Sequence, residues 1–488
     1  MAEVRFLLNG APHVAKDVDP NETLLEHLRV AGLTGTKEGC AEGECGACAV
    51  ALVARAPDGT TRYEAVNACL LLLATLDGRE VVSVEGIARG GELHPCQAEM
   101  ARAGGSQCGY CTPGFVVSLF AEYYRGRDGA LDPESIAGNL CRCTGYRPIR
   151  EAAERLATVR TKERAEAAPD PHRARLASPA VPLGGVRLVS ADASGASRRF
   201  VRPTSLSEAC ALRAADPTLV PVSGGTDLVV EINQRHRRFE GLLSLEAIPE
   251  LRVWEETDAH LAIGAGVPLA EVEERVHGRG ELRMLTELLP LFSSRLIRTR
   301  ATFGGNLGTA SPIGDGPPAL LGLGAELVLV SARGQRSVSL DAFFLDYRKT
   351  ALAPDELIAE VRIPKPFART QRFYKVSKRR MDDISTVAAG FALDRGEGGD
   401  VTSLRLAFGG VAATPKRARA AESVLLGRTI TSDGVGRARA EALHELSPID
   451  DHRGSARYRR AMIDRLIQRF FDEVSASDAA AALPARQA

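Results

Sequence analysis

The sequence contains no long hydrophobic run and carries no net charge. No apolar stretch reaches the roughly 18–20 residues that a membrane span needs, and the N-terminus lacks the basic-then-apolar pattern of a signal peptide. Lys plus Arg and Asp plus Glu both total 62, which argues against a nucleic-acid binder and against a polybasic membrane-surface protein. We therefore expect a cytoplasmic protein with no nucleic-acid or membrane partner, in a compartment where structural disulfides are rare.

Cysteine is absent from the second half of the chain, since none follows Cys210. Most of the ten cysteines instead form two sets near the N-terminus. Cysteines with only a packing role would be scattered, so this clustering in a cytoplasmic chain indicates metal or redox chemistry. Cys96 and Cys210 lie outside both sets and are expected to be buried core residues, with His94 as a capping or packing residue.

The length of 488 residues predicts about three or four domains. Strand patterns at 4–8 and 50–53, an Asn9-Gly10 turn and a helix at 23–28 predict an α+β unit. Helices starting at Pro95, Pro113 and Pro133 and a fourth at 149–159 predict an all-helical unit. The predicted boundaries are 1–86, 87–159, a linker at 160–196, α+β segments at 197–369 and 370–478, and a disordered tail at 479–488.

The first cysteine set has the spacing C-x4-C-x2-C, in Cys40, Cys45 and Cys48, followed by Cys69. This spacing is typical of a plant-type ferredoxin with one [2Fe–2S] cluster. Three glycines let such a loop curl so that the thiolates converge and backbone N–H groups point at sulfur, and they are Gly39, Gly43 and Gly46. A zinc site is the alternative, although zinc sites usually show paired C-x2-C knuckles.

The second set combines C-x2-C at Cys108 and Cys111 with C-x-C at Cys141 and Cys143. By itself this pattern leaves iron–sulfur and zinc ligation both open. Cys111 lies at a helix start marked by Pro113, where the partial positive charge would stabilise an anionic site. Cys141 and Cys143 are about 200° apart on a regular helix and must therefore lie on a turn if both are ligands.

Two Gly-Gly pairs in the middle of the chain, Gly224-Gly225 and Gly304-Gly305, are each followed by small polar residues. Adjacent glycines allow backbone amides to approach a pyrophosphate closely. Neither pair matches the G-x-G-x-x-G fingerprint or the P-loop, so a tight turn is the ordinary alternative.

The segments Gln107–Gly114 and Gly138–Tyr146, together with the first cysteine set, resemble the iron–sulfur part of the xanthine oxidase family of molybdenum hydroxylases. The resemblance implies two [2Fe–2S] clusters in series, one held by Cys40, Cys45, Cys48 and Cys69 and the other by Cys108, Cys111, Cys141 and Cys143. It also implies that Gln107 contacts the pterin of a molybdenum cofactor on a partner subunit.

The glycine segments resemble the FAD-binding domain of the same family, which is related to the vanillyl-alcohol-oxidase type of flavoprotein. The fold class implied is a multidomain α+β protein: a β-grasp ferredoxin domain, a four-helix [2Fe–2S] domain, a two-part FAD-binding domain and a C-terminal α+β domain. The residues that match flavin-contacting positions are Pro221, Val222, Ser223, Gly224, Gly225, Thr226, Asp227, Leu228, Phe292, Thr302, Phe303, Gly304, Gly305, Asn306, Asp315, Ile358 and Lys375.

In that family Phe292 would stack on the flavin and Asp315 would accept ribose hydroxyls. Loops at 343–350 and 378–384 would border the reactive face of the flavin and decide whether NAD⁺ or O2 collects the electrons. Without the resemblance, the second loop would be an exposed charged turn.

The resemblance implies an electron-transfer subunit of a purine hydroxylase. Electrons from hypoxanthine or xanthine, oxidised to urate at a molybdenum centre on a large partner subunit, would pass through both clusters to FAD and NAD⁺. No substrate-converting catalytic residue is expected in this chain, and a dimer of heterodimers is the implied assembly. The alternatives are a related molybdenum hydroxylase acting on an aldehyde or N-heterocycle, a zinc-stabilised scaffold without redox activity, and a stand-alone flavin NADH oxidoreductase.

Overall fold

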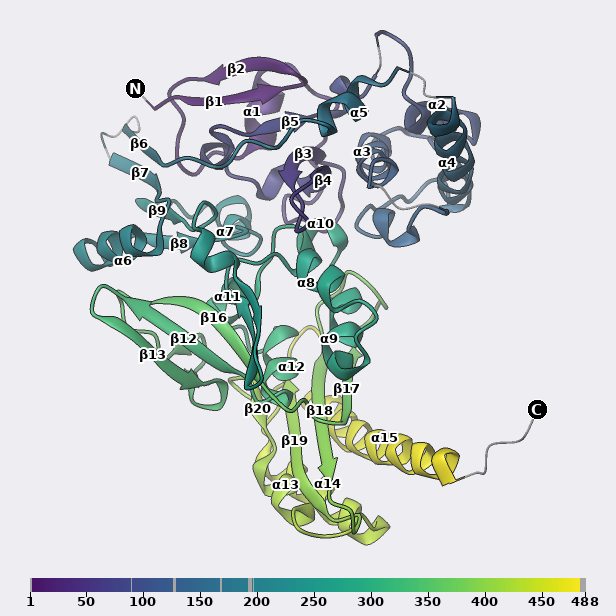
Figure 1. The fold of residues 1–488 in the computed structure, drawn as a ribbon, viewed down its shortest axis with the longest axis vertical. Helices are drawn as coiled ribbons and strands as arrows, with labels where there is room; N and C mark the ends of the chain where they lie inside the picture. The colour runs from purple at the N-terminus through teal and green to yellow at the C-terminus, as the bar shows by residue number, and fades with distance from the viewer. Residues whose placement is uncertain are drawn as a thin grey trace. The chain divides into compact units, whose positions relative to one another are not determined.

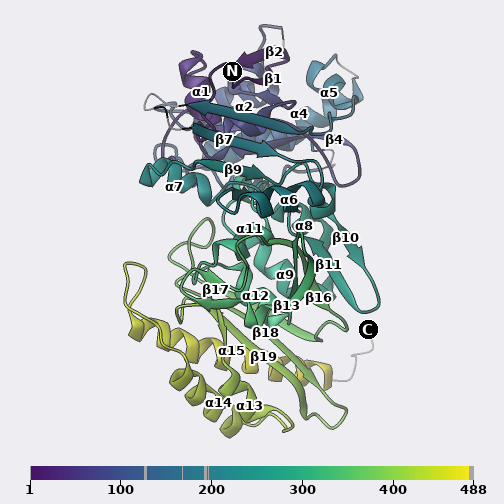
Figure 2. The same cartoon turned by 90° about the vertical axis from the view of Figure 1, so that its left-hand side faces the viewer.

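The computed structural model describes residues 2–88, 90–125, 129–166, 169–191, 195 and 197–482. The chain divides into two compact units (Figure 1 and Figure 2). Unit 1 comprises Met1–Pro249, Pro268–Glu271 and Ser294–Thr302, and unit 2 comprises Glu250–Val267, Val272–Ser293 and Phe303–Ala488. Within the described ranges, no helix is both long enough and apolar enough to cross a membrane.

Unit 1 begins with a five-stranded sheet of order β2-β1-β5-β3-β4. Its strands are β1 (Val4–Leu8), β2 (Ala11–Ala15), β3 (Ala49–Arg55), β4 (Thr61–Asn67) and β5 (Glu80–Val82). Asn9 and Gly10 both have positive φ, 54° and 80°, as the tight β1–β2 hairpin requires. Helix α1 (Leu24–Val30) begins at a capping box between Thr23 and Glu26. The predicted β-grasp unit is confirmed.

The helical part of unit 1 contains α2 (Pro95–Arg102), α3 (Thr112–Tyr123) and α4 (Arg147–Ala165). The third predicted helix is only a 3-10 helix, Pro133–Ile136, capped by the Asp132 side chain. The chain turns soon after it at Gly138, where an added Cβ would lie 2.7 Å from the Ser294 Cβ. His94 caps α2, as expected, and Cys96 is fully buried beside it.

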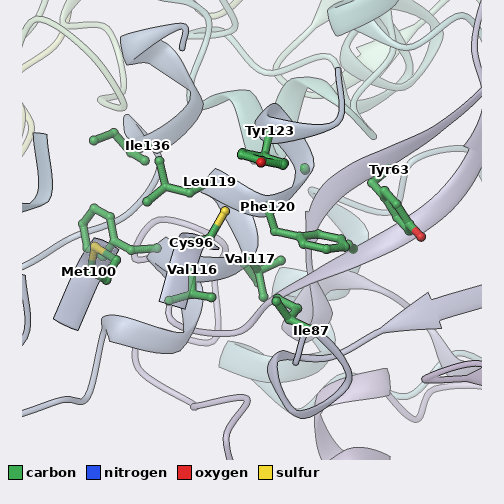
Figure 3. Packing of buried hydrophobic residues seen from close by; sticks show 14 of the residues in the cluster. Tyr63, Ile87, Cys96, Met100, Val116, Val117, Leu119, Phe120, Tyr123 and Ile136 are labelled. Carbon is green, nitrogen blue, oxygen red and sulfur yellow. The ribbon is translucent and has the colours of Figure 1, made fainter. Parts of the chain in front are cut away.

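One hydrophobic core joins this helical part to the first sheet (Figure 3). The ring of Tyr63 on β4 lies 4.7 Å from that of Phe120 on α3, measured between centroids. Cys96 and Met100 of α2 belong to the same cluster. Because the two parts bury each other's apolar side chains, residues 2–88 and the helices that follow are expected to unfold together.

The segment expected to be a linker, 160–196, is partly structured. Asp170 caps α5 (Pro171–Leu176), and β6 (Val186–Ala191) pairs with β7 (Ser197–Arg202). Residues 167, 168, 192–194 and 196 of this segment lie outside the described residues. Unit 1 ends in a second sheet of order β6-β7-β9-β8, with β8 (Val220–Val222), β9 (Gly241–Ser244), α6 (Leu206–Ala215) and α7 (Leu228–Arg235). Cys210 is buried on α6, as expected.

Unit 2 contains a five-stranded sheet of order β10-β11-β16-β12-β13. These strands are β10 (Trp254–Glu256), β11 (His260–Gly264), β12 (Glu326–Ser331), β13 (Gly334–Ser339) and β16 (Leu357–Pro364). Helices α9 (Arg283–Leu288), α11 (Phe303–Thr309) and α12 (Gly316–Gly322) belong to the same unit.

The C-terminal part of unit 2 is a sheet of order β17-β18-β19-β20 packed against helices. The strands are β17 (Thr370–Val376), β18 (Val387–Arg395), β19 (Val401–Gly409) and β20 (Lys416–Arg417), and the helices are α13 (Arg419–Leu425), α14 (Ser432–Glu445) and α15 (Ala456–Ala482). Thus 479–482, expected to begin the tail, continue α15, and 483–488 lie outside the described residues. The predicted multidomain α+β class is confirmed.

Candidate functional site

The four cysteines of the first set come together in unit 1. Cys40, Cys45 and Cys48 lie on the loop between α1 and β3, and Cys69 lies in a 3-10 turn after β4. The pKa of Cys69 is raised, first by its hydrogen bond with Cys48, then by burial and by the charges of Cys48, Cys40 and Cys45. The loop and the separate fourth cysteine therefore form one site.

Within this site the sulfurs are arranged as two pairs. The Cys45 thiol donates to Cys40, which lowers the pKa of Cys40 to about 5 against the opposing effect of burial. Backbone N–H groups of Glu42, Cys45 and Glu44 also point at the Cys40 sulfur, and the Cys45 N···Sγ distance is 3.3 Å. Cys48 and Cys69 form the second pair.

The glycines of this loop act as the sequence predicted. Gly43 and Gly46 adopt φ of +88° and +63°, which only glycine reaches without strain. A Cβ on Gly39 would lie 2.8 Å from the Cys45 sulfur. Asn67, which sequence reasoning missed, fixes the loop by donating to the Gly43 carbonyl (N···O 3.0 Å).

The second set also forms two pairs. The Cys108 and Cys143 sulfurs lie 3.5 Å apart. Burial, followed by the hydrogen bond with Cys141, raises the pKa of Cys111 to about 12. Cys111 immediately precedes α3, and Cys141 and Cys143 lie on the turn before α4, as predicted.

Solvent reaches the second site but not the inner part of the first. Cys48 and Cys69 are 1% and 2% exposed, whereas Cys108 and Cys143 are exposed residues. Gln107, beside Cys108, is also exposed. Thr144, another residue that sequence reasoning missed, places its hydroxyl 3.1 Å from the Cys141 sulfur.

The two ligand loops are in direct hydrogen-bond contact. Leu140 N–H donates to the Cys45 carbonyl, and the Asn139 side chain donates to the Gly46 carbonyl, each over 3.0 Å. Gly114 at the start of α3 makes this approach possible, since a Cβ there would lie 2.1 Å from the Gly46 oxygen. Cys45 of the first set and Leu140, which precedes Cys141 of the second set, are thus joined by one hydrogen bond.

The paired sulfurs fit [2Fe–2S] clusters better than zinc. Four thiolates around a single tetrahedral ion would be equivalent neighbours, which sulfurs arranged in two pairs are not. In a [2Fe–2S] cluster each iron takes two cysteines, so two pairs are the required arrangement. The eight cysteines therefore fit two such clusters.

The flavin residues predicted in unit 1 form a strand–loop–helix segment. Val222 ends β8, and α7 begins at Leu228. A Cβ on Gly224 would lie 1.9 Å from the Arg300 oxygen, and Gly225 has φ of +77°, so both positions require glycine. Thr302, also predicted, is buried in the same unit.

Two of the flavin residues predicted in unit 2, Lys375 and Asp315, form a buried ion pair. Lys375 Nζ lies 2.7 Å from Asp315 Oδ2 and 2.7 Å from the Leu291 carbonyl oxygen. Ser385 donates to the other Asp315 oxygen over 2.5 Å, so Asp315 already has two partners. Phe292 is half-buried beside Leu291, and Ile358 is buried on β16.

The first turn of α11 carries Phe303, Gly304, Gly305 and Asn306. Gly304 lies so close to the Ala265 backbone that an added Cβ would be 2.6 Å away. The Asn306 Oδ1 atom is buried and has no hydrogen-bond partner among the described residues. An unpartnered acceptor beside a glycine-lined backbone is the arrangement that a bound nucleotide would complete.

Four family models match consecutive parts of the chain. A "2Fe-2S iron-sulfur cluster binding domain" matches residues 6–74, and a "[2Fe-2S] binding domain" matches 83–154. An "FAD binding domain in molybdopterin dehydrogenase" matches 195–366, and a "CO dehydrogenase flavoprotein C-terminal domain" matches 372–474. The predicted cofactors of the chain, two [2Fe–2S] clusters and FAD, are confirmed.

Curated relatives resemble almost the whole chain. The xanthine dehydrogenase of Emericella nidulans is 33% identical over 96% of this chain and 38% of its own length. The xanthine dehydrogenase/oxidase of Gallus gallus is 32% identical over 84% of this chain and 35% of its own length. The chain thus spans less than two-fifths of these relatives.

Among solved structures, carbon monoxide dehydrogenase from Hydrogenophaga pseudoflava is 30% identical with a TM-score of 0.52, covering 55% of this chain and 94% of that one. Quinoline 2-oxidoreductase from Pseudomonas putida 86 is 27% identical with a TM-score of 0.52, covering 56% and 94%.

Proposed function

This chain belongs to the xanthine oxidase family of molybdenum hydroxylases, and we propose that it is the electron-transfer subunit of a xanthine dehydrogenase. When bound, the two clusters would relay single electrons and the FAD would collect two of them for NAD⁺. The protein would set spacing, potential and access, while the chemistry belongs to the cofactors. The observation that carries the proposal is the pair of cysteine quartets whose ligand loops are hydrogen-bonded through Cys45 and Leu140.

The proposed donor is a molybdenum cofactor on a large partner subunit, where hypoxanthine or xanthine would be oxidised to urate. The exposure of the second site supports this direction. Gln107, Cys108 and Cys143 are solvent-accessible, and Tyr110 between them is 49% exposed. An electron donor that docks here would reach the second cluster first, and Gln107 would contact its pterin.

The residues proposed to contact the flavin are found in both units, and each set is considered by itself. In unit 1 the backbone of Ser223–Asp227 would meet the pyrophosphate without a side-chain cation. In unit 2 the Lys375–Asp315 ion pair would fix the Asp315 carboxylate for ribose hydroxyls, and Asn306 Oδ1 would gain a donor. The exposed loop containing Tyr347, with its 59% exposed ring, would control access of NAD⁺.

The experiment that tests the electron-transfer role is metal and acid-labile sulfide analysis of the purified chain, followed by EPR after dithionite reduction. We expect equal iron and sulfide and two distinct rhombic signals. A colourless protein that contains zinc and no sulfide would instead establish the scaffold alternative. We also expect the chain to transfer electrons from NADH to a dye without any partner. This partial reaction tests whether FAD is bound independently of whether the clusters are present.

A second candidate function is the same role in a hydroxylase of N-heterocycles or aldehydes. The similarity to quinoline 2-oxidoreductase favours the N-heterocycle version. Steady-state assays of the complex with xanthine, nicotinate and benzaldehyde distinguish these substrates. We propose a dimer of heterodimers, which sedimentation of the purified complex would test. We also propose a cytoplasmic location, which cell fractionation would test.

A further inference from the structure

Helix α7, far from the cysteines in sequence, places two side-chain amides on the first ligand loops. Asn233 Nδ2 donates to the Ala41 and Cys69 carbonyl oxygens, each over 2.8 Å. Gln234 Nε2 donates to the Cys40 carbonyl oxygen over 2.7 Å. Both hydrogens of one amide group therefore connect the three-cysteine loop to the separate segment that carries the fourth cysteine.

The Asn233 bonds also connect the two sulfur pairs. Ala41 follows Cys40, a member of the first pair, and Cys69 belongs to the second. If each pair of sulfurs holds one iron, the Asn233 amide is hydrogen-bonded to the backbone beside a ligand of each iron, at Ala41 and at Cys69. Loss of such supporting bonds shifts ligand geometry even though no metal–sulfur bond is removed.

One of these bonds acts on the same peptide unit as an N–H···S bond. The Ala41 carbonyl accepts from Asn233, and the Glu42 N–H of that peptide donates to the Cys40 sulfur. A peptide group whose oxygen accepts a hydrogen bond becomes a better donor at its nitrogen. Asn233 therefore strengthens a donor that offsets negative charge at the cluster, and this raises the reduction potential.

Helix α7 is also continuous with the glycine loop proposed to hold the flavin pyrophosphate. Gly225 approaches the Leu70 carbonyl so closely that an added Cβ would lie 3.3 Å from its oxygen. One short segment, from Gly225 to Gln234, thus contacts the Cys69–Leu70 backbone at its beginning and near its end. The position of the phosphate loop and that of the cluster loops depend on the same helix.

We propose that Asn233, assisted by Gln234, is a positioning residue that fixes the ligand loops of the first cluster and raises its reduction potential. This role rests on the proposed electron-transfer function. Asn233 makes none of the iron–sulfur bonds, and its effect is transmitted through the Ala41 and Cys69 carbonyl groups. The second cluster lacks any contact with it among the hydrogen bonds of the described residues.

The test compares Asn233→Leu and Asn233→Asp with matched substitutions at Asn21. Asn21 is a buried asparagine of the same unit that joins distant segments, with bonds of 3.0 Å and 2.8 Å to the Phe239 backbone, and it contacts neither cluster loop. Redox titration of the full chain followed by EPR measures each cluster separately. Thermal unfolding measures the loss of stability common to both positions.

We expect the first-cluster potential to fall in Asn233→Leu and to fall further in Asn233→Asp, where a carboxylate faces two carbonyl oxygens. The first-cluster EPR signal should change, while the second-cluster signal and FAD content stay constant. Gln234→Leu, at an exposed position, should give a smaller fall in the same direction. The Asn21 variants should lower thermal stability without moving either potential.

A first-cluster potential that is the same in the Asn233 and Asn21 variants would overturn the positioning role. So would equal shifts of both clusters. If the unmodified protein shows no pair of EPR signals, the electron-transfer function itself fails. If it shows both signals and Asn233→Leu moves neither, only the inference about Asn233 fails.

Discussion

The first cysteine site, called the closed site below, is more buried than the second, called the open site, although each holds two pairs of thiols. In the closed site Cys48 and Cys69 are buried and the other two cysteines are partly exposed, whereas in the open site Cys108 and Cys143 are exposed and only Cys141 is buried. The closed site is supported from several parts of the chain, including Asn67 and Asn233. The open site is supported by its own turn, through Thr144, and by the bonds of Asn139 and Leu140 to the first cysteine loop. Both sites thus offer four thiols in two pairs, but they differ in how far solvent reaches them.

Removing a ligand of the open site should have the largest effect. Cys143→Ser should abolish xanthine-to-NAD⁺ turnover, because electrons entering from the partner would no longer reach the flavin, yet leave NADH-to-dye reduction intact. Both rates are measured on the same preparation. Cys210→Ala, a buried cysteine of α6 outside both sites, serves as the control and should retain both activities. Unchanged xanthine turnover in Cys143→Ser would refute the ligand assignment.

The contact between the two sites should be sensitive to a single methyl group. Gly114→Ala would place a Cβ about 2.1 Å from the Gly46 oxygen, and such overpacking costs about 1–3 kcal/mol. Gly436→Ala, a helical glycine of α14 with open space around it, should instead be neutral or stabilising by up to about 1 kcal/mol. Denaturant unfolding measures both. Equal stabilities of the two variants would contradict the close approach of the ligand loops.

Solvent access should decide the order in which the clusters are lost. When the purified chain is treated with a chelator, the EPR signal of the open site should decay before that of the closed site, because Cys108 and Cys143 are exposed. Addition of the proposed molybdenum-binding partner should slow the loss of the open-site cluster selectively. The opposite order of decay would show that exposure does not control cluster stability here.

The smallest expected effect comes from single hydrogen bonds to sulfur. Thr144→Val removes the hydroxyl 3.1 Å from the Cys141 sulfur and should lower the potential of the second cluster only. Asn233→Leu should lower that of the first cluster only. In redox titrations, each variant should therefore change the potential of one cluster and leave that of the other cluster unchanged. A shift of both potentials by either variant would mean that the sites are not independently supported.

Local features of the sequence predicted local structure well. The Asn9-Gly10 hairpin, the helix near 23–28 and the two cysteine sets were predicted because each depends on nearby residues or on a specific spacing. The capping role of Thr23, which was expected to lie inside that helix, was not predicted. Which two sulfurs of each set lie together was not predictable, because it depends on the conformation of the loops and not on the spacing of the cysteines. Asn233 gives no sequence signal, because its partners Ala41 and Cys69 lie more than 160 residues away.

Segments without clear periodicity were harder to predict. The strand β6 lies inside 160–196 and pairs with β7 along its whole length, a pairing that the predicted linker did not include. The helix expected at Pro133 is a 3-10 helix that ends at Ile136, and the chain then passes close to Ser294 at Gly138, an approach that was not predictable from local pattern alone. The flavin-contacting residues were predicted from the family resemblance. The contacts of Asp315 with Lys375 and Ser385 could be seen only in the structure.

The hydrogen bonds from Asn139 and Leu140 to the Cys45–Gly46 backbone have a consequence for biogenesis. They hold the segment that carries Cys141 against the loop that carries Cys45. We expect the cluster of the closed site to be inserted before these bonds form, and the cluster of the open site, where Cys108 and Cys143 are exposed, to be inserted afterwards.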